Sequence, residues 1–274
     1  MQKKISFSLV FTQTCNFFRN RITQFVLISL ALSLIYTFFT FFFIKENNLT
    51  EQIYVSQNLT KYFSFLGLAC LLNIILKAIN IATVSNLYVS DKLNLNLLLS
   101  KTLSNTLKII LFYLITGIFI FFIAIMLTIV IIGLSIILPN PILLLLIILV
   151  LLVPMLLFAI FCNLFLGSLA DPNQKSIFEL ISLNIQLSKK YWLPALLMLL
   201  INIVFLIVFT NLVLKFNNNN FVLDTIFSFI SIFFDIFVTS FFYRLYMLAT
   251  HLNNSALPPK NNDEHQNNNY KLII

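Results

Sequence analysis

The sequence predicts an all-α polytopic membrane protein, with six transmembrane helices and one cytoplasmic amphipathic helix between the fourth and fifth spans. Two features of the composition predict this class. Hydrophobic residues make up 60% of the chain and charged residues only 9%, whereas soluble domains contain about 25% charged residues. A third observation is an uninterrupted run of 62 residues, 109–170, that contains no charged residue. These features exclude an ordinary water-soluble domain.

The uncharged run predicts a hairpin of two membrane helices. A single helix of this length would extend about 90 Å, roughly three times the thickness of the hydrocarbon core of a bilayer. The residues Pro139, Asn140 and Pro141 offer a turn, because proline interrupts a helix. The third and fourth spans are therefore placed at residues 109–138 and 142–166.

The remaining spans are apolar runs bounded by polar segments. Residues 1–24 form a cytoplasmic N-terminal segment, residues 25–250 form the membrane domain, and residues 251–274 form a disordered cytoplasmic tail rich in Asn. Each apolar run reaches the length of about 20 residues that crosses a bilayer. The four further spans are placed at residues 25–44, 62–88, 193–214 and 221–248.

The distribution of basic residues predicts the orientation. With the N-terminus inside the cell, thirteen Lys and Arg residues fall on the cytoplasmic side and three in the outer loops. Such an excess is typical of cytoplasmic loops, so both termini are expected in the cytoplasm of a bacterial cell, with the chain in the inner membrane. The basic residues stand in short groups at the ends of apolar runs, which favours the lipid bilayer and not nucleic acid as the partner.

The segment between the fourth and fifth spans predicts a helix along the membrane surface, beginning near Asp171 and Pro172. One face repeats polar residues and another repeats apolar residues at helical spacing; these are Glu179, Ser182, Gln186 and Lys189, and Phe178, Ile181 and Ile185. The segment ends in two bases and two aromatic residues, Lys189, Lys190, Tyr191 and Trp192. These four are candidate contacts to anionic lipids or to a partner protein; the alternative is a connector without a binding role.

Two charged residues within spans are candidate functional residues. Lys77 lies in the second span with Asn73 and Asn80 on the same helical face, and Asp235 lies in the middle of the sixth span. A lone charge at the centre of a bilayer costs at least about 3 kcal/mol. One interpretation is a polar pathway in which Lys77 and Asp235 contact a substrate or form a gate. The alternatives are a single buried ion pair, or a Lys77 that reaches toward the membrane surface while Asp235 is neutral.

Three segments carry distinctive residues: residues 16–20 (NFFRN), residues 242–248 (FYRLYML) and the amphipathic segment 176–195. These segments resemble the YciC-like family of multi-pass inner-membrane proteins of enterobacteria and their relatives. The resemblance covers nearly the whole chain to residue 252. It implies a six-span inner-membrane protein with no assigned biochemical activity.

No pattern in the sequence indicates catalysis. Cys15, Cys70 and Cys162 are isolated, His251 and His265 lie at or beyond the end of the last span, and no glycine-rich phosphate loop is present. We therefore expect no enzyme activity, cofactor or metal. The leading hypothesis is a non-catalytic envelope or membrane-organising protein with an unidentified membrane-protein partner. The alternative is a transporter of a small solute or lipid that uses a polar path between spans two and six, and an intramembrane enzyme ranks third.

Overall fold

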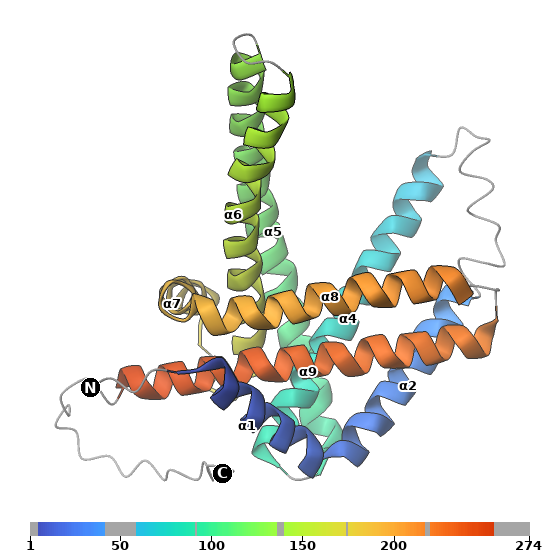
Figure 1. Cartoon of the computed structure of the whole chain (residues 1–274). Coiled ribbons are helices and arrows are strands. Elements are labelled where there is room, and N and C mark those ends of the chain that lie inside the picture. The colour runs from blue at the N-terminus through green and yellow to red at the C-terminus, as the bar shows by residue number, and fades with distance from the viewer. Residues whose placement is uncertain are drawn as a thin grey trace.

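A computed structural model describes residues 5–41, 59–90, 92–135, 140–173, 175–216 and 220–254, and within these ranges the secondary structure is helical, without strands. The helices are α1 (Phe7–Asn20), α2 (Ile22–Thr40), α4 (Leu59–Val89), α5 (Leu95–Ser135), α6 (Asn140–Ser168), α7 (Ile177–Lys190), α8 (Trp192–Phe216) and α9 (Phe221–Asn254) (Figure 1). The predicted all-α class is confirmed for this part of the chain.

Five of these helices are long and apolar enough to cross a membrane, namely α2, α4, α5, α8 and α9. The predicted fourth span corresponds to α6, which is 29 residues long. The part of α6 whose side chains the structure describes, Leu152–Ser168, is apolar. The multi-pass helical class is thus confirmed, and the sixth span stays a prediction.

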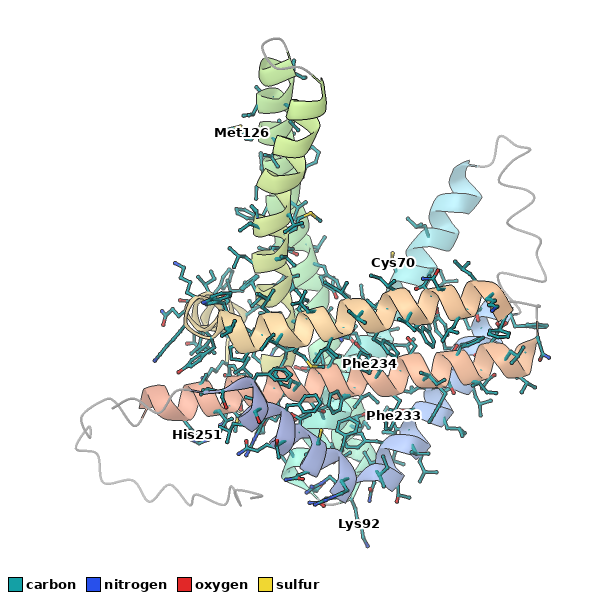
Figure 2. All side chains as sticks on the ribbon, in the orientation of Figure 1. Cys70, Lys92, Met126, Phe233, Phe234 and His251 are labelled. Carbon is teal, nitrogen blue, oxygen red and sulfur yellow. The ribbon has the colours of Figure 1, made fainter. Side chains whose placement is uncertain are left out.

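Helix α9 lies at the centre of the packing. It contacts α1, α2, α4, α6 and α8, and Figure 1 shows α8 and α9 running side by side. Two neighbouring residues of α9 point to different partners (Figure 2): the ring of Phe234 stacks 3.8 Å from that of Phe205 on α8, and Phe233 meets Phe18 of α1 edge-on at 5.7 Å. Aromatic side chains therefore fill the space on several sides of α9.

Helices α5 and α6 form the predicted hairpin, which projects away from α8 and α9 (Figure 1). Helix α5 ends at Ser135 and α6 begins at Asn140; Pro139 lies outside the described residues. Between Ile118 and Ile132 the side chains are exposed, except for two that are half-buried. The outer half of α5, residues 118–132, is therefore an apolar surface that the rest of the described chain leaves uncovered.

A glycine allows α6 and α9 to approach closely. A Cβ atom on Gly167 would lie 2.7 Å from the backbone carbon of Phe242 and 2.7 Å from the backbone nitrogen of Tyr243. Small residues commonly permit such approaches between membrane helices. The small residues Ala78 and Ala82 of α4 are also fully buried.

Helix α5 extends beyond the third predicted span at its N-terminal end. Helix α5 begins at Leu95 and not at residue 109, because no Gly or Pro interrupts the segment and the side chain of Asn94 accepts hydrogen bonds from the backbone N–H groups of residues 96 and 97. Lys101 consequently lies inside the helix, where its Nζ donates to Ser85 Oγ at 2.7 Å.

The surface helix, by contrast, begins later than predicted. Asp171 and Pro172 precede α7, whose N-cap is Ser176. Ser176 and Glu179 form a capping box, in which each side chain accepts a hydrogen bond from the backbone N–H of the other residue. This reciprocal cap fixes the start of the helix.

The two ends of the chain differ from the predicted boundaries. Residues 7–20 of the N-terminal segment form α1, with Val10, Phe17 and Phe18 buried. Helix α9 continues to Asn254, so residues 251–254 belong to the helix and not to the tail. The rest of the predicted tail, and residues 42–44 of the first predicted span, lie outside the described residues.

Candidate binding cavity between the membrane helices

The packing of α4 against α9 brings three of the predicted intramembrane residues together. Lys77 and Asn80 lie one turn apart on α4, so they share one face of the helix. This face meets Asp235 in the middle of α9.

Both carboxylate oxygens of Asp235 accept hydrogen bonds from α4. Lys77 Nζ donates to Asp235 Oδ1 at 2.5 Å, and Asn80 Nδ2 donates to Asp235 Oδ2 at 2.7 Å. Lys77 also donates to Thr239 Oγ1 at 3.3 Å, one turn further along α9. The ion pair is therefore present. The alternative prediction, in which Lys77 extends to the membrane surface, does not agree with this structure.

The ion pair borders a cavity of about 800 Å³ lined by α2, α4, α5, α8 and α9. The Lys77 side chain is 19% exposed and that of Asp235 is 37% exposed, so the pair is accessible from the cavity. Many lining residues are polar, which is unusual between apolar membrane helices. They are Tyr36, Thr40, Asn73, Lys77, Asn80, Tyr113, Asp224, Ser228, Ser231 and Asp235.

The cavity lies toward one end of the bundle. Thr40 at the end of α2, Val213 near the end of α8 and Asp224 in the first turn of α9 line it. On the other side of the ion pair the helices are tightly packed, because residues 81–87 of α4 and residues 238–243 of α9 are all buried. Lys77 and Asp235 thus mark the boundary between an open half and a closed half.

Energetics argue against a purely stabilising role for this polar group. A buried ion pair is seldom more stable than apolar residues that fill the same space. Asn80 Oδ1 is moreover buried without a hydrogen-bond partner in the described part of the chain, and an unsatisfied polar atom costs about 1–3 kcal/mol. Stability alone therefore does not account for these polar side chains.

Asn73, the fourth predicted intramembrane residue, has a different environment. It lines the same cavity, but its Nδ2 donates to the backbone carbonyl of Ala69 at 2.9 Å. The prediction that it shares a face with Lys77 holds, although no direct hydrogen bond joins the two side chains.

The predicted interfacial group at the end of α7 is only partly exposed. Lys189 and Lys190 are exposed, and Trp192 is 47% exposed. Tyr191 is 8% exposed, because it lies between α7 and α8 and its ring packs into the core. Tyr191 is therefore not available for contact with lipid or a partner, and this part of the prediction is wrong.

Residues of the segment 242–248 hold the end of α9 in place. Arg244 Nε donates to Gln13 Oε1 of α1 at 2.7 Å. The hydroxyl of Tyr246 donates to Asp171 Oδ2 at 3.1 Å and accepts from Lys175 Nζ at 3.3 Å. These contacts fix α9 to α1 and to the connection between α6 and α7, away from the cavity.

The cysteines are not paired with one another. Cys15, Cys70 and Cys162 are free thiols, and Cys70 lines the cavity. Burial raises the pKa of the Cys15 thiol in α1. Among the described residues no group of three or more His, Cys, Asp or Glu side chains is placed to hold a metal ion.

Several lining residues were not identified from the sequence. Tyr36, Tyr113 and Asp224 come from three different helices, and only the packing of these helices shows that they share one cavity. Asp224 lies near the start of a predicted span, and its sequence context is the same as that of an acidic residue at the membrane surface.

Comparisons with known proteins leave the family open. No protein-family model matches the chain, and neither a curated protein nor a solved structure is similar to it. The resemblance to the YciC-like family therefore stays a prediction.

Proposed function

We propose that the protein is a multi-pass membrane carrier that binds a small polar solute in the cavity beside Lys77 and Asp235. The observation that carries this proposal is the ion pair at the border of an open cavity of about 800 Å³. A polar solute in this cavity exchanges hydrogen bonds with water for hydrogen bonds with the lining side chains, which lowers the cost of entering the membrane.

The asymmetry of the cavity supports alternating access. The half of the bundle around Tyr36 and Asp224 is open, and the half beyond Asp235 is closed by packed side chains. With both termini in the cytoplasm of an inner membrane, as the basic residues predict, this conformation faces outward. Transport then requires α4 and α9 to separate beyond the ion pair and to close on the outer side.

Uptake by proteoliposomes tests the carrier function. Vesicles with the full-length protein are incubated with a mixture of small metabolites, and their contents are compared by mass spectrometry with those of protein-free vesicles. We expect at least one solute to accumulate in the wild type and not in the Asp235→Asn variant. The proposal would be contradicted if vesicles with the wild-type protein had the same contents as protein-free vesicles.

Two asparagines provide a matched pair for this assay. Asn73 and Asn211 are exposed side chains that each donate to the carbonyl four residues earlier in the helix, but the lining of the cavity includes only Asn73. Asn73→Leu should reduce uptake, and Asn211→Leu should leave uptake unchanged. Equal effects of the two variants on uptake would show that transport does not depend on this cavity.

A non-catalytic membrane-organising role is the second candidate. The observation in its favour is the exposed outer half of α5, which projects with α6 from the other helices (Figure 1) and offers a large apolar surface to a membrane-protein partner. In-cell crosslinking from tagged protein tests this role. A reproducible protein partner lost on Phe121→Ala and Phe122→Ala replacement would support it, and recovery of lipid alone would contradict it.

A further inference from the structure

We infer that the ligand of the cavity is a zwitterion, a molecule that carries one ammonium group and one carboxylate or phosphate group. The inference rests on the proposed carrier function, because it names the class of solute that the same cavity binds. It is argued from the hydrogen-bonding capacity of the ion pair, from its charge balance and from the cavity walls.

The ion pair retains unused hydrogen-bonding capacity. A lysine ammonium has three donors, and Lys77 directs two of them to Asp235 and Thr239. The third donor has no acceptor in the described part of the chain and is available to an anionic group. The carboxylate of Asp235 is 37% exposed and is available to an ammonium group, while Asn80 holds one of its oxygens from the protein side.

Charge balance selects against ligands with a single charge. A cation bound at Asp235 gives the site a net charge of +1, and an anion bound at Lys77 gives it a net charge of −1. An unpaired charge is costly at membrane depth. A zwitterion replaces both partners at once, since its ammonium group binds Asp235 while its anionic group binds Lys77. The net charge of the site does not change.

This exchange also accounts for the position of the pair. Lys77 and Asp235 join the two helices at the boundary of the closed half. When a zwitterion occupies both residues, the direct link between α4 and α9 is removed. Ligand binding thereby weakens the contact that must open for the ligand to pass.

The cavity walls suit a ligand with an apolar or aromatic substituent. Phe209 of α8 and Phe227 of α9 line the cavity together with Tyr36 and Tyr113. Two sources provide the required chemistry: a free amino acid, and the phosphoethanolamine head group of a lipid. Both combine an ammonium group with an anion within a few bonds.

Ligands matched in shape and differing in charge test the inference. The purified full-length protein, in nanodiscs without phosphatidylethanolamine, is titrated with L-phenylalanine, L-phenylalaninamide and 3-phenylpropanoate, and thermal unfolding reports binding. The lipid arm compares short-chain dihexanoyl phosphatidylethanolamine with dihexanoyl phosphatidylglycerol. We expect at least one of the zwitterions to bind about tenfold or more tightly than its singly charged analogues. The inference would be overturned if neither zwitterion binds, or if every zwitterion that binds is matched in affinity by one of its singly charged analogues.

Variants of the pair give a second readout. Lys77→Met should shift preference to the cation L-phenylalaninamide, and Asp235→Asn to the anion 3-phenylpropanoate. An unchanged ligand ranking in both variants, when folded, would overturn the inference; if neither folds, the wild-type ranking decides. Binding and transport together distinguish this inference from the carrier function. Binding of a zwitterion without transport would refute the carrier function and support the inference. Transport of a singly charged analogue in preference to its zwitterion would support the carrier function and refute the inference.

Discussion

The α4–α9 pair and the outer half of the α5–α6 hairpin are both built from long apolar helices, yet they differ in what their side chains contact. Buried Asn, Ser and Thr residues line the contact of α4 with its neighbours, including Asn80, Thr83 and Asn86. On α5, Phe121, Phe122 and the residues around them are exposed.

The two regions also differ in hydropathy. Among the five candidate spans, that of α5 has the highest mean hydropathy, 3.0, against 1.8 for that of α4. The more apolar helix has the uncovered surface, whereas the less apolar helix provides the ion pair and much of the cavity lining. In a membrane, polar side chains on a span indicate a contact with protein, water or ligand.

Glycine replacement should produce the largest difference between the two regions. Gly167→Ala places a methyl group against the backbone of α9, and overpacking of this kind costs about 1–3 kcal/mol. Gly117 has no atom within 4 Å of an added Cβ, so Gly117→Ala should be neutral or stabilise the helix. Thermal unfolding in one detergent measures both; equal destabilisation would contradict the close packing of α6 on α9.

Charge reversal should separate the contribution of the pair from that of each residue. Lys77→Ala or Asp235→Ala leaves one charge without its partner and should destabilise the protein by about 2 kcal/mol, less than in a sealed core because the pair faces the cavity. The double variant Lys77→Asp with Asp235→Lys should recover more than half of this loss. Thermal unfolding of the wild type, the two single variants and the double variant provides the comparison. A double variant that is no more stable than the single variants would contradict a direct ion pair.

Removal of the cap at α7 should have a moderate and local effect. Ser176→Ala deletes a side chain that accepts from the backbone N–H of Glu179, which should cost about 1 kcal/mol. Hydrogen exchange should rise in the first turn of α7 and remain unchanged in α5. Increased exchange throughout the bundle would show that the cap supports more than the surface helix.

The bases at the end of α7 should have the smallest effect on stability. Replacing Lys189 and Lys190 with Gln removes two exposed charges and should weaken crosslinking to anionic lipid, since each surface base contributes about 1 kcal/mol. Thermal stability should hardly change. Unchanged crosslinking with normal insertion would leave α7 as a connector, the alternative that the sequence also allowed.

The sequence was sufficient for the hairpin and for the shared face of Lys77 and Asn80, because local patterns determine both. The pair with Asp235 was only one of several alternatives, since it depends on how α4 packs against α9. An uncharged run of this length must fold back, and Lys77 and Asn80 share a face through helical spacing alone. The location of Tyr191 was not predictable, since an aromatic residue after two bases has the same pattern whether its ring meets lipid or the core. The cavity was not predictable either, because it depends on how α2, α5 and α8 surround the pair.

Thiol labelling of Cys70 tests the central claim, that the cavity is open to water from the outer side. A variant with Cys15→Ala and Cys162→Ala keeps Cys70 alone, and Met126→Cys in a cysteine-free background provides a control on the outer half of α5 (Figure 2). Both positions are exposed on the protein, but only Cys70 faces the cavity. With a membrane-impermeant maleimide added to intact cells, we predict labelling of Cys70 at least about tenfold faster than of the control, because the thiolate requires water. Equal and slow labelling of the two positions would contradict a water-accessible binding cavity.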